Sequence, residues 1–595
     1  MEFSLHIGKW GNAAQTIHDA IARFYTPALF FLACLTFFIL GLAQINLAPE
    51  SANIGTVPFL KVAVFLQDHG SMANVWNLFV HGEYKAAIQH PLYPLLLSSV
   101  GVAPPDLFFA GKMLSLIIGL GVVASFFAIA RDLYGNLVAY IAVLLLAFNV
   151  TFLNMVSQVI CESLLILFML LSLYWVIKGF EKEPYWLWAG AAAGLAYLTK
   201  GTGLLLLPVF TATAVLGTGI RTLTRRWFWL FFLGFALTAS PLIVRNLVVY
   251  HEPVHEGAVS MVPWMDTYDD HYKADVGWAI KYPEVVWDED RFPTMRSYLA
   301  NHSWADIFVR FRYGVKKEAQ LVLSSLDLFL LPQERYYGHL LFLFFVLGLA
   351  LASNRAQMFC VLMTVGAFFV PFAWDYQVVP KEQEAVRFIA PLIPVICLYA
   401  AVGIVATLTA VDRRLATRSL GISLQKLLPP VLVVVCVATL GYVLATYNTT
   451  FPGSLPPIPQ DHTELYRWLE QNMSDDDLIM VSHNTPYWQY LWLAKFHGRW
   501  AFWLANSREV QEESIGELTR LVGEKRAGRN RYILLHRDDV IRTASLEPYF
   551  VWSETDGLRP AELIEGWTEV YRHQQRPSLF LIYRVEQERS RARIE

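Results

Sequence analysis

Four ionisable side chains stand near the ends of long apolar segments: Glu162 in VICESLLILF, Lys200 in YLTKGTG, Arg245 in SPLIVRN and Arg387 in EAVRFIAPLIP. A charge at the centre of a membrane span costs about 2.5–3.5 kcal/mol on insertion scales, so each of these residues needs a reason. Taken singly, a long cation can snorkel to the membrane surface. Taken together, one acid among three bases indicates a single polar cavity that opens outward.

The segment after the first apolar block carries further candidates. Its acids are Glu50, Asp68 and Glu83. The run HGEYKAAIQHPLYPLLL covers 81–97. Because proline restricts the residue before it, His90-Pro91 and Tyr93-Pro94 predict an extended chain with a His and a Tyr at its turn. This run either lines the cavity or is a Pro-rich entry into the next span.

Long apolar blocks must position these residues. The chain is 55% hydrophobic and 16% charged, whereas a soluble chain carries about 25% charge. Blocks of roughly 17–24 apolar residues are long enough to cross the bilayer as helices. The sequence therefore predicts a polytopic α-helical membrane protein with about eleven or more spans. The candidate spans are 27–46, 107–130, 137–153, 159–177, 185–199, 203–219, 227–246, 337–352, 359–374, 388–410 and 428–446.

Basic residues are distributed unevenly over the connections, with inner-loop clusters at 221–226 and 412–426. The positive-inside rule then places the N-terminus in the cytoplasm and the C-terminal part on the extracytoplasmic side of the cell membrane. The segments 47–106, 247–336 and 447–595 lie on the outer side in this topology. The net charge of −3 does not favour a nucleic-acid partner.

The C-terminal part reads as an α/β soluble domain. A helix-like stretch at 463–471 precedes a strand-like one at 478–482, and an amphipathic stretch at 509–525 precedes another at 532–536. The Pro-rich FPGSLPPIP at 451–459 is typical of a linker. We therefore predict two domains, a transmembrane one over 1–446 and an extracytoplasmic one over 447–595.

The runs HPLYPLLL, LTKG, RNLVVYHEPV and RFIAPLIP, in this order and at these spacings, resemble the GT-C superfamily of glycosyltransferases. The branch they resemble is that of the protein O-mannosyltransferases and the lipid A aminoarabinose transferase. The similarity covers about 27–410. It implies a GT-C-like catalytic domain that transfers a hexose or pentose from a polyprenyl-phosphate donor. The acceptor would be a lipid, glycan or protein at the outer face of the cell envelope.

The resemblance also implies roles for individual residues. Glu162 matches an acid at the start of the fourth span, and Lys200 and Arg245 match bases that hold the donor phosphate. Arg387 is a further candidate for substrate binding. His90 and Tyr93 match the loop that lines the cavity. A cation near the phosphate would stabilise the negative charge that grows on it as its bond to the sugar breaks. A carboxylate would act as general base on the acceptor hydroxyl. Direct displacement with one base implies inversion.

The position of the base depends on the register of the first outer loop. The family shows an Asp soon after the first span, followed by a Tyr and an Ala at helical spacing. If Phe59 and Ala63 take those two places, Gly55 replaces the Asp and Glu50 is the nearest acid. If GEYKAAIQHPLYP sets the register instead, Asp68 falls at the acid position. We favour Glu50 because it follows the first span closely.

Other chemistries and functions remain as alternatives. Asp266, Asp269, Asp270 and His271 could hold a divalent cation, although a solvated loop face is the simpler interpretation. The chain has no phosphate-binding P-loop and no nucleotide-binding Gly-rich turn, so neither ATP nor a nucleotide sugar is expected. A transporter or flippase for a lipid-linked glycan would also need charges at the membrane edge. A non-catalytic GT-C relative is the third possibility, because the expected acid is displaced.

Overall fold

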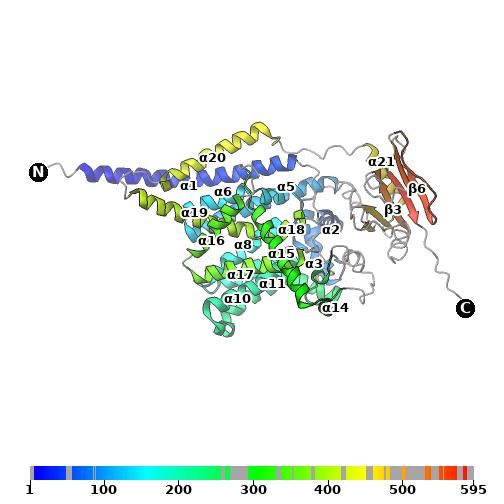
Figure 1. The fold of residues 1–595 in the computed structure, drawn as a ribbon, viewed down its shortest axis with the longest axis horizontal. Coiled ribbons are helices and arrows are strands. Elements are labelled where there is room, and N and C mark those ends of the chain that lie inside the picture. Colours follow the sequence, from blue (N-terminus) through cyan, green and yellow to red (C-terminus); the bar gives the residue numbers. More distant parts are fainter. Residues whose placement is uncertain are drawn as a thin grey trace.

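The computed structural model covers the whole chain. It describes residues 6–47, 56–84, 86, 89–102, 104–255, 262–267, 293–329, 337–351, 354–376, 382–416, 424–449, 460–474, 477–482, 499–503, 530–537, 549–553, 555–572 and 580–585. The first part is helical as far as residue 472, and a small sheet follows it. Figure 1 shows α1 (His6–Leu47) leaving the helical bundle at one end, while the strands lie beyond the other end.

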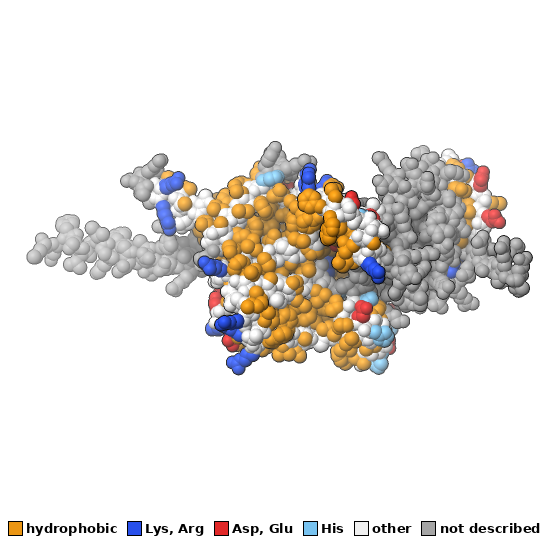
Figure 2. Space-filling view, turned by 60° about the horizontal axis from the view of Figure 1, so that its bottom comes forward, with side chains coloured by type: hydrophobic (Ala, Val, Ile, Leu, Met, Phe, Trp, Pro, Cys, Tyr) orange, Lys and Arg blue, Asp and Glu red, His pale blue; other side chains and the backbone are white. Residues whose placement is uncertain are grey.

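Eight stretches of helix in the described part of the chain are long and apolar enough to cross a membrane. They lie within α1, α5 (Pro104–Tyr134), α8 (Glu162–Gly179), η1 with α10 (Gly201–Leu205 and Leu206–Thr218), α11 (Arg226–Tyr250), α17 (Arg355–Asp375), α19 (Leu392–Ala416) and α20 (Leu424–Thr446). Several of these helices, for example α11 and α20, carry exposed apolar side chains. Figure 2 shows a broad hydrophobic surface on this part of the molecule. Such a surface suits contact with lipid chains.

The remaining predicted spans fall on shorter helices. These are α6 (Asn136–Ala147) with α7 (Val150–Val156), α9 (Tyr185–Thr199) and α16 (Tyr337–Ala350). Each of the eleven predicted segments therefore coincides with a helix, although α9 has only 15 residues. The polytopic helical architecture is confirmed.

Small residues let α9 pack closely against its neighbours in the interior. A Cβ at Gly190 would lie 1.8 Å from the backbone oxygen of Phe231 on α11, and one at Gly194 would lie 1.9 Å from Oγ1 of Thr238. The hydroxyl of Ser172 on α8 donates to the carbonyl of Ala189 at 2.9 Å. Close approach through Gly and Ala is how helices associate inside membranes, and most side chains of α9 are buried, so α9 is an interior helix.

The segments 47–106 and 247–336, called the first and second outer segments after their predicted side, contain further helices. The first segment contains α2 (Thr56–Asp68), α3 (Ser71–Val80) and α4 (Leu92–Ser98). The second contains α14 (Met295–Asn301) and α15 (Trp304–Ser324), and α18 (Glu382–Ile389) lies just before α19. The extended chain predicted over HPLYP is wrong in part, because α4 begins directly after Pro91. Tyr93 and Pro94 lie in its first turn. Proline is tolerated there, because backbone N–H groups of the first turn have no acceptor within the helix.

The C-terminal part contains α21 (Gln460–Asn472) and a five-stranded mixed sheet. The strand order is β2-β1-β3-β7-β6, with β1 parallel to β2 and β3, and β7 antiparallel to β3 and β6. The strands are β1 (Leu478–Ser482), β2 (Arg499–Trp503), β3 (Arg531–His536), β6 (Trp567–Arg572) and β7 (Phe580–Val585), and β4 (Phe550–Ser553) pairs with β5 (Gly557–Pro560). The helix and the strands agree with the predicted α/β character of the C-terminal part, while the amphipathic stretch at 509–525 lies outside the described residues.

The topology is a testable consequence of this arrangement. We expect a reporter fused after Arg226, the first residue of α11 and the last of the basic cluster at 221–226, to report the cytoplasm. A reporter fused after Gln460, at the start of α21, should report the outer side, because the inner connections are the basic ones. Paired alkaline phosphatase and fluorescent protein fusions measure this directly. The same side for both fusions would contradict the architecture.

Candidate active site at the ends of the spans

Three of the predicted site residues meet in one ion cluster. Oε1 of Glu162 lies 3.0 Å from Nζ of Lys200 and 2.7 Å from Nε of Arg387. Glu162 is the first residue of α8, Lys200 follows the last residue of α9, and Arg387 lies in the last turn of α18. The structure thus brings these three predicted residues into direct contact.

The cluster is largely removed from solvent. The side chain of Glu162 is 0% exposed, and those of Lys200 and Arg387 are 17% and 13% exposed. One carboxylate between two cations leaves a formal charge of +1 in this region. A buried ion needs such partners, because the loss of hydration is costly.

The backbone at Lys200 explains how its side chain reaches Glu162. Lys200 has φ −160° and ψ 143°, so the chain is extended for one residue between α9 and η1. The ammonium group also lies 4.7 Å from the centre of the Phe388 ring, next to Arg387 on α18. An aromatic face attracts a cation, so α18 contributes two contacts to the cluster.

His90 and Tyr93 are buried close to the ends of α8 and α9. Nδ1 of His90 forms a short hydrogen bond with the carbonyl oxygen of Tyr197, which lies in the last turn of α9. The hydroxyl of Tyr93 shares a hydrogen bond of 2.7 Å with that of Ser115 on α5. Both side chains are buried. Their placement beside the ends of α8 and α9 is compatible with the cavity-lining role implied by the resemblance.

Arg245 lies apart from the ion cluster and makes different contacts. Its Nη1 donates to the carbonyl oxygen of Ala86 at 2.7 Å, and its guanidinium lies 5.5 and 5.3 Å from the rings of Tyr84 and Tyr250. Nε and Nη2 are buried and have no hydrogen-bond acceptor among the described residues. Arg245 is therefore not part of the ion cluster that Glu162 forms with Lys200 and Arg387.

The first outer segment connects the surroundings of Arg245 with those of the ion cluster. Ala86 contacts Arg245, and His90, four residues further on, contacts Tyr197 at the end of α9. Four residues of extended chain span at most about 14 Å. The guanidinium of Arg245 and the ion cluster thus border the same region at the ends of α8, α9 and α11.

The carboxylates that could act as general base lie in other surroundings than the basic side chains. Asp68 is the last residue of α2 and is exposed, and Glu83 is exposed as well. Glu50 lies outside the described residues. Phe59 and Ala63 lie on the buried face of α2, and the Phe59 ring meets that of Tyr93 edge to face at 5.3 Å. The helical spacing expected for these two positions is therefore present.

The possible cation ligands do not form a cluster in the part of the chain that the structure describes. Nε2 of His302 lies 3.0 Å from Oδ1 of Asp266, while Asp269, Asp270 and His271 lie outside the described residues. The described residues contain no group of three His, Cys, Asp or Glu side chains that could hold a metal ion. A divalent cation stays an untested alternative.

Sequence reasoning missed two buried cations. Lys112 is fully buried on α5, one turn before Ser115, and its Nζ lies 4.7 Å from the ring of Phe108. The criterion that selected Glu162, a charge inside an apolar block, would have found it. Arg310 on α15 is the second buried cation, and it lies in an amphipathic segment where an arginine attracts no notice.

The buried ion cluster predicts unequal effects of two similar substitutions. We expect Glu162→Gln to lower the free energy of unfolding by about 3–5 kcal/mol, because two buried cations lose their counter-charge. The matched control is Glu181→Gln, whose carboxylate is also 3.0 Å from a lysine, Lys178, but is 59% exposed. Its effect should stay within about 1 kcal/mol. Unfolding in detergent micelles measures both, and equal effects would contradict the prediction.

Comparisons with known proteins agree with this architecture. Residues 95–244 match the family model described as dolichyl-phosphate-mannose-protein mannosyltransferase. No curated protein matches the chain in sequence. Among solved structures, the chain is similar to ArnT from Cupriavidus metallidurans bound to undecaprenyl phosphate. The identity is 13% and the TM-score 0.51, over 94% of this chain and 97% of that one.

Two further structures are similar. The apo state of the same ArnT gives 13% identity and a TM-score of 0.50, over 95% of this chain and 98% of that one. The archaeal oligosaccharyltransferase AglB from Archaeoglobus fulgidus gives 12% identity and a TM-score of 0.46, over 91% and 74%. The matched family segment contains Glu162 and Lys200 and ends one residue before Arg245. The chain is therefore a multi-pass membrane protein with the fold of the GT-C superfamily, as its four motifs predicted.

Proposed function

We propose that this protein is a membrane glycosyltransferase that takes a sugar from a polyprenyl-phosphate donor. The sugar passes to a hydroxyl of a lipid, glycan or protein acceptor at the outer face. The fold shared with ArnT, whose structure holds undecaprenyl phosphate, supports this proposal. So does the match of residues 95–244 to a family model named for a dolichyl-phosphate-linked sugar.

The observation that carries the proposal is the guanidinium of Arg245. Nε and one Nη of an arginine form an edge that receives two oxygens of a phosphate in parallel hydrogen bonds. In Arg245, Nη1 is used by Ala86, while Nε and Nη2, which form this edge, are buried without an acceptor among the described residues. A buried donor without a partner costs free energy. A phosphate oxyanion would satisfy both donors.

The ion cluster fits a role in stabilising the leaving phosphate. When the bond between the sugar and the phosphate breaks, negative charge accumulates on the phosphate, and fixed cations nearby lower the barrier. Lys200 retains further N–H donors beyond the one that Glu162 accepts. In this mechanism Glu162 orients the two cations and limits their mutual repulsion. The binding of the lipid tail would use the apolar surface of the spans.

A carboxylate of the first outer segment would act as the base. It would remove the proton of the acceptor hydroxyl while the oxygen attacks the anomeric carbon, and the phosphate leaves on the opposite face. One base with direct displacement gives inversion. The buried face of α2 formed by Phe59 and Ala63 supports the register in which Glu50 is the base, with Asp68 as the alternative. The domain at 447–595 would lie on the same outer side.

The phosphate site is tested by a change that keeps the charge of Arg245 but removes its planar edge. We expect Arg245→Lys to weaken the binding of undecaprenyl phosphate at least about tenfold, since charge-assisted hydrogen bonds contribute about 1.5–3 kcal/mol. Lys200→Ala should weaken binding to a similar extent. The control is Arg226→Lys, at the exposed opposite end of α11. Titration of purified protein in detergent measures binding, and wild-type affinity in both site variants would refute the phosphate role.

The base is tested with isosteric amides. We expect Glu50→Gln to retain the binding of undecaprenyl phosphate and to lose transfer by a factor of about a hundred to ten thousand. Asp68→Asn should have a mild effect. Transfer from a panel of radiolabelled polyprenyl-phosphate sugars measures both. The reverse pattern would move the base to Asp68, and less than a tenfold loss in both variants would overturn a carboxylate base in this segment.

A further inference from the structure

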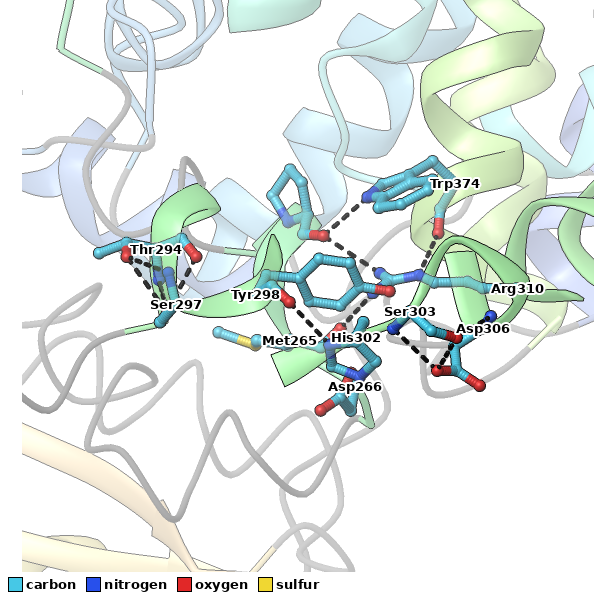
Figure 3. A network of polar contacts seen from close by, with 11 residues as sticks. Met265, Asp266, Thr294, Ser297, Tyr298, His302, Ser303, Asp306, Arg310 and Trp374 are labelled. Carbon is cyan, nitrogen blue, oxygen red and sulfur yellow. Dashed lines mark hydrogen bonds and ion pairs between the residues drawn. The ribbon is translucent and has the colours of Figure 1, made fainter. Parts of the chain in front are cut away.

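Arg310 joins two parts of the chain that are distant in sequence. It lies on α15, and its side chain is 4% exposed. Nη1 donates to the carbonyl of Met265 at 2.8 Å, Nη2 to that of Pro263 at 3.2 Å, and Nε to that of Trp374 at 3.1 Å. Figure 3 shows the guanidinium between the loop and the end of α17. One side chain thus ties the second outer segment to a membrane helix.

Aromatic rings complete this attachment. The guanidinium carbon lies 4.6 Å from the centre of the Trp374 ring and 5.0 Å from that of Tyr298. Nε1 of Trp374 donates to the carbonyl of Pro263 at 2.7 Å, the same oxygen that Nη2 of Arg310 binds. A lysine has no planar edge and cannot reproduce these contacts.

The end of α17 has a particular need for an external donor. Trp374 is the second-last residue of this helix, so its carbonyl has no partner within the helix. Pro371, inside the last turns, lacks an N–H and removes another bond from the helix. A cation at a helix C-terminus is also favourable. Gly314, one turn after Arg310, allows the close approach, because a Cβ there would lie 1.6 Å from the Ala373 oxygen.

The same end of α17 also contacts α18, the helix that carries Arg387 of the ion cluster. Phe372 stacks on Phe388 of α18, with ring centres 4.6 Å apart and an angle of 21°. Phe388 in turn lies 4.7 Å from Nζ of Lys200, and its neighbour Arg387 binds Glu162. A continuous series of contacts therefore leads from Arg310 through the end of α17 to Arg387.

We propose that Arg310 is a positioning residue for the ion cluster. By fixing the last turn of α17 and residues 263–265, it holds α18 in the place where Arg387 reaches Glu162. Its effect on substrate passes through Arg387 and rests on the proposed function above. Its effect on the structure of α18 does not depend on that function.

The structural part is tested by hydrogen exchange in Arg310→Lys. We expect the amides of α18 and of residues 262–266 to exchange roughly tenfold or more faster than in the wild type, because charge-assisted hydrogen bonds are lost. The control is Arg312→Lys, an exposed position two residues away on α15, which should leave both segments unchanged. Faster exchange confined to 262–266, with α18 unchanged, would overturn the proposal.

The functional part is tested by a double-mutant cycle with undecaprenyl phosphate as the ligand. Arg310→Lys and Arg387→Lys should each weaken binding, and the double variant should bind within about twofold of Arg387→Lys alone, because the first change acts through the second residue. Losses that multiply would show independent effects and contradict the positioning role. If the wild type binds no polyprenyl phosphate, the proposed donor is wrong, and the exchange experiment still decides the role of Arg310.

Discussion

The arrangement of the site depends on the burial of Glu162. A carboxylate that is 0% exposed at the end of an apolar helix is tolerated only with counter-charges in contact. Those charges come from Lys200, 38 residues away, and Arg387, 225 residues away. The ends of α8, α9 and α18 must therefore meet at one point, and the electrostatic cost of any other arrangement is large.

Close packing in the interior brings the helix ends into that position. The glycines of α9 allow its backbone to approach α11, and the hydroxyl of Ser172 links α8 to α9. Because these helices approach closely at the glycines, the residues at their ends lie near one another. Arg245, on α11, reaches the first outer segment at Ala86, and His90 reaches α9 from the same segment. Packing in the lipid-embedded region thus determines the geometry of polar groups at its edge.

The outer segments are held by arginines that bind backbone carbonyls. Arg245 binds the carbonyl of Ala86, and Arg310 binds those of Pro263, Met265 and Trp374. Carbonyls at helix ends and in loops need donors when they are buried. Both arginines are buried with aromatic rings close to the guanidinium. They differ in one respect that matters for chemistry, since Arg310 uses Nε and both Nη groups while Arg245 retains a buried edge without an acceptor among the described residues.

The sequence by itself determined the helical membrane architecture, the strands at 478–482 and 532–536, and the residue types of the site. Apolar block length and side-chain alternation depend on neighbours in the chain, so these features are readable without a structure. Four motifs in order were also enough to predict the GT-C fold. Only the tertiary structure decided which charges pair, that Arg245 stands apart from Glu162, and that Arg310 supports α18. Those contacts join residues tens to hundreds of positions apart, and their geometry follows from helix packing, which no local pattern specifies.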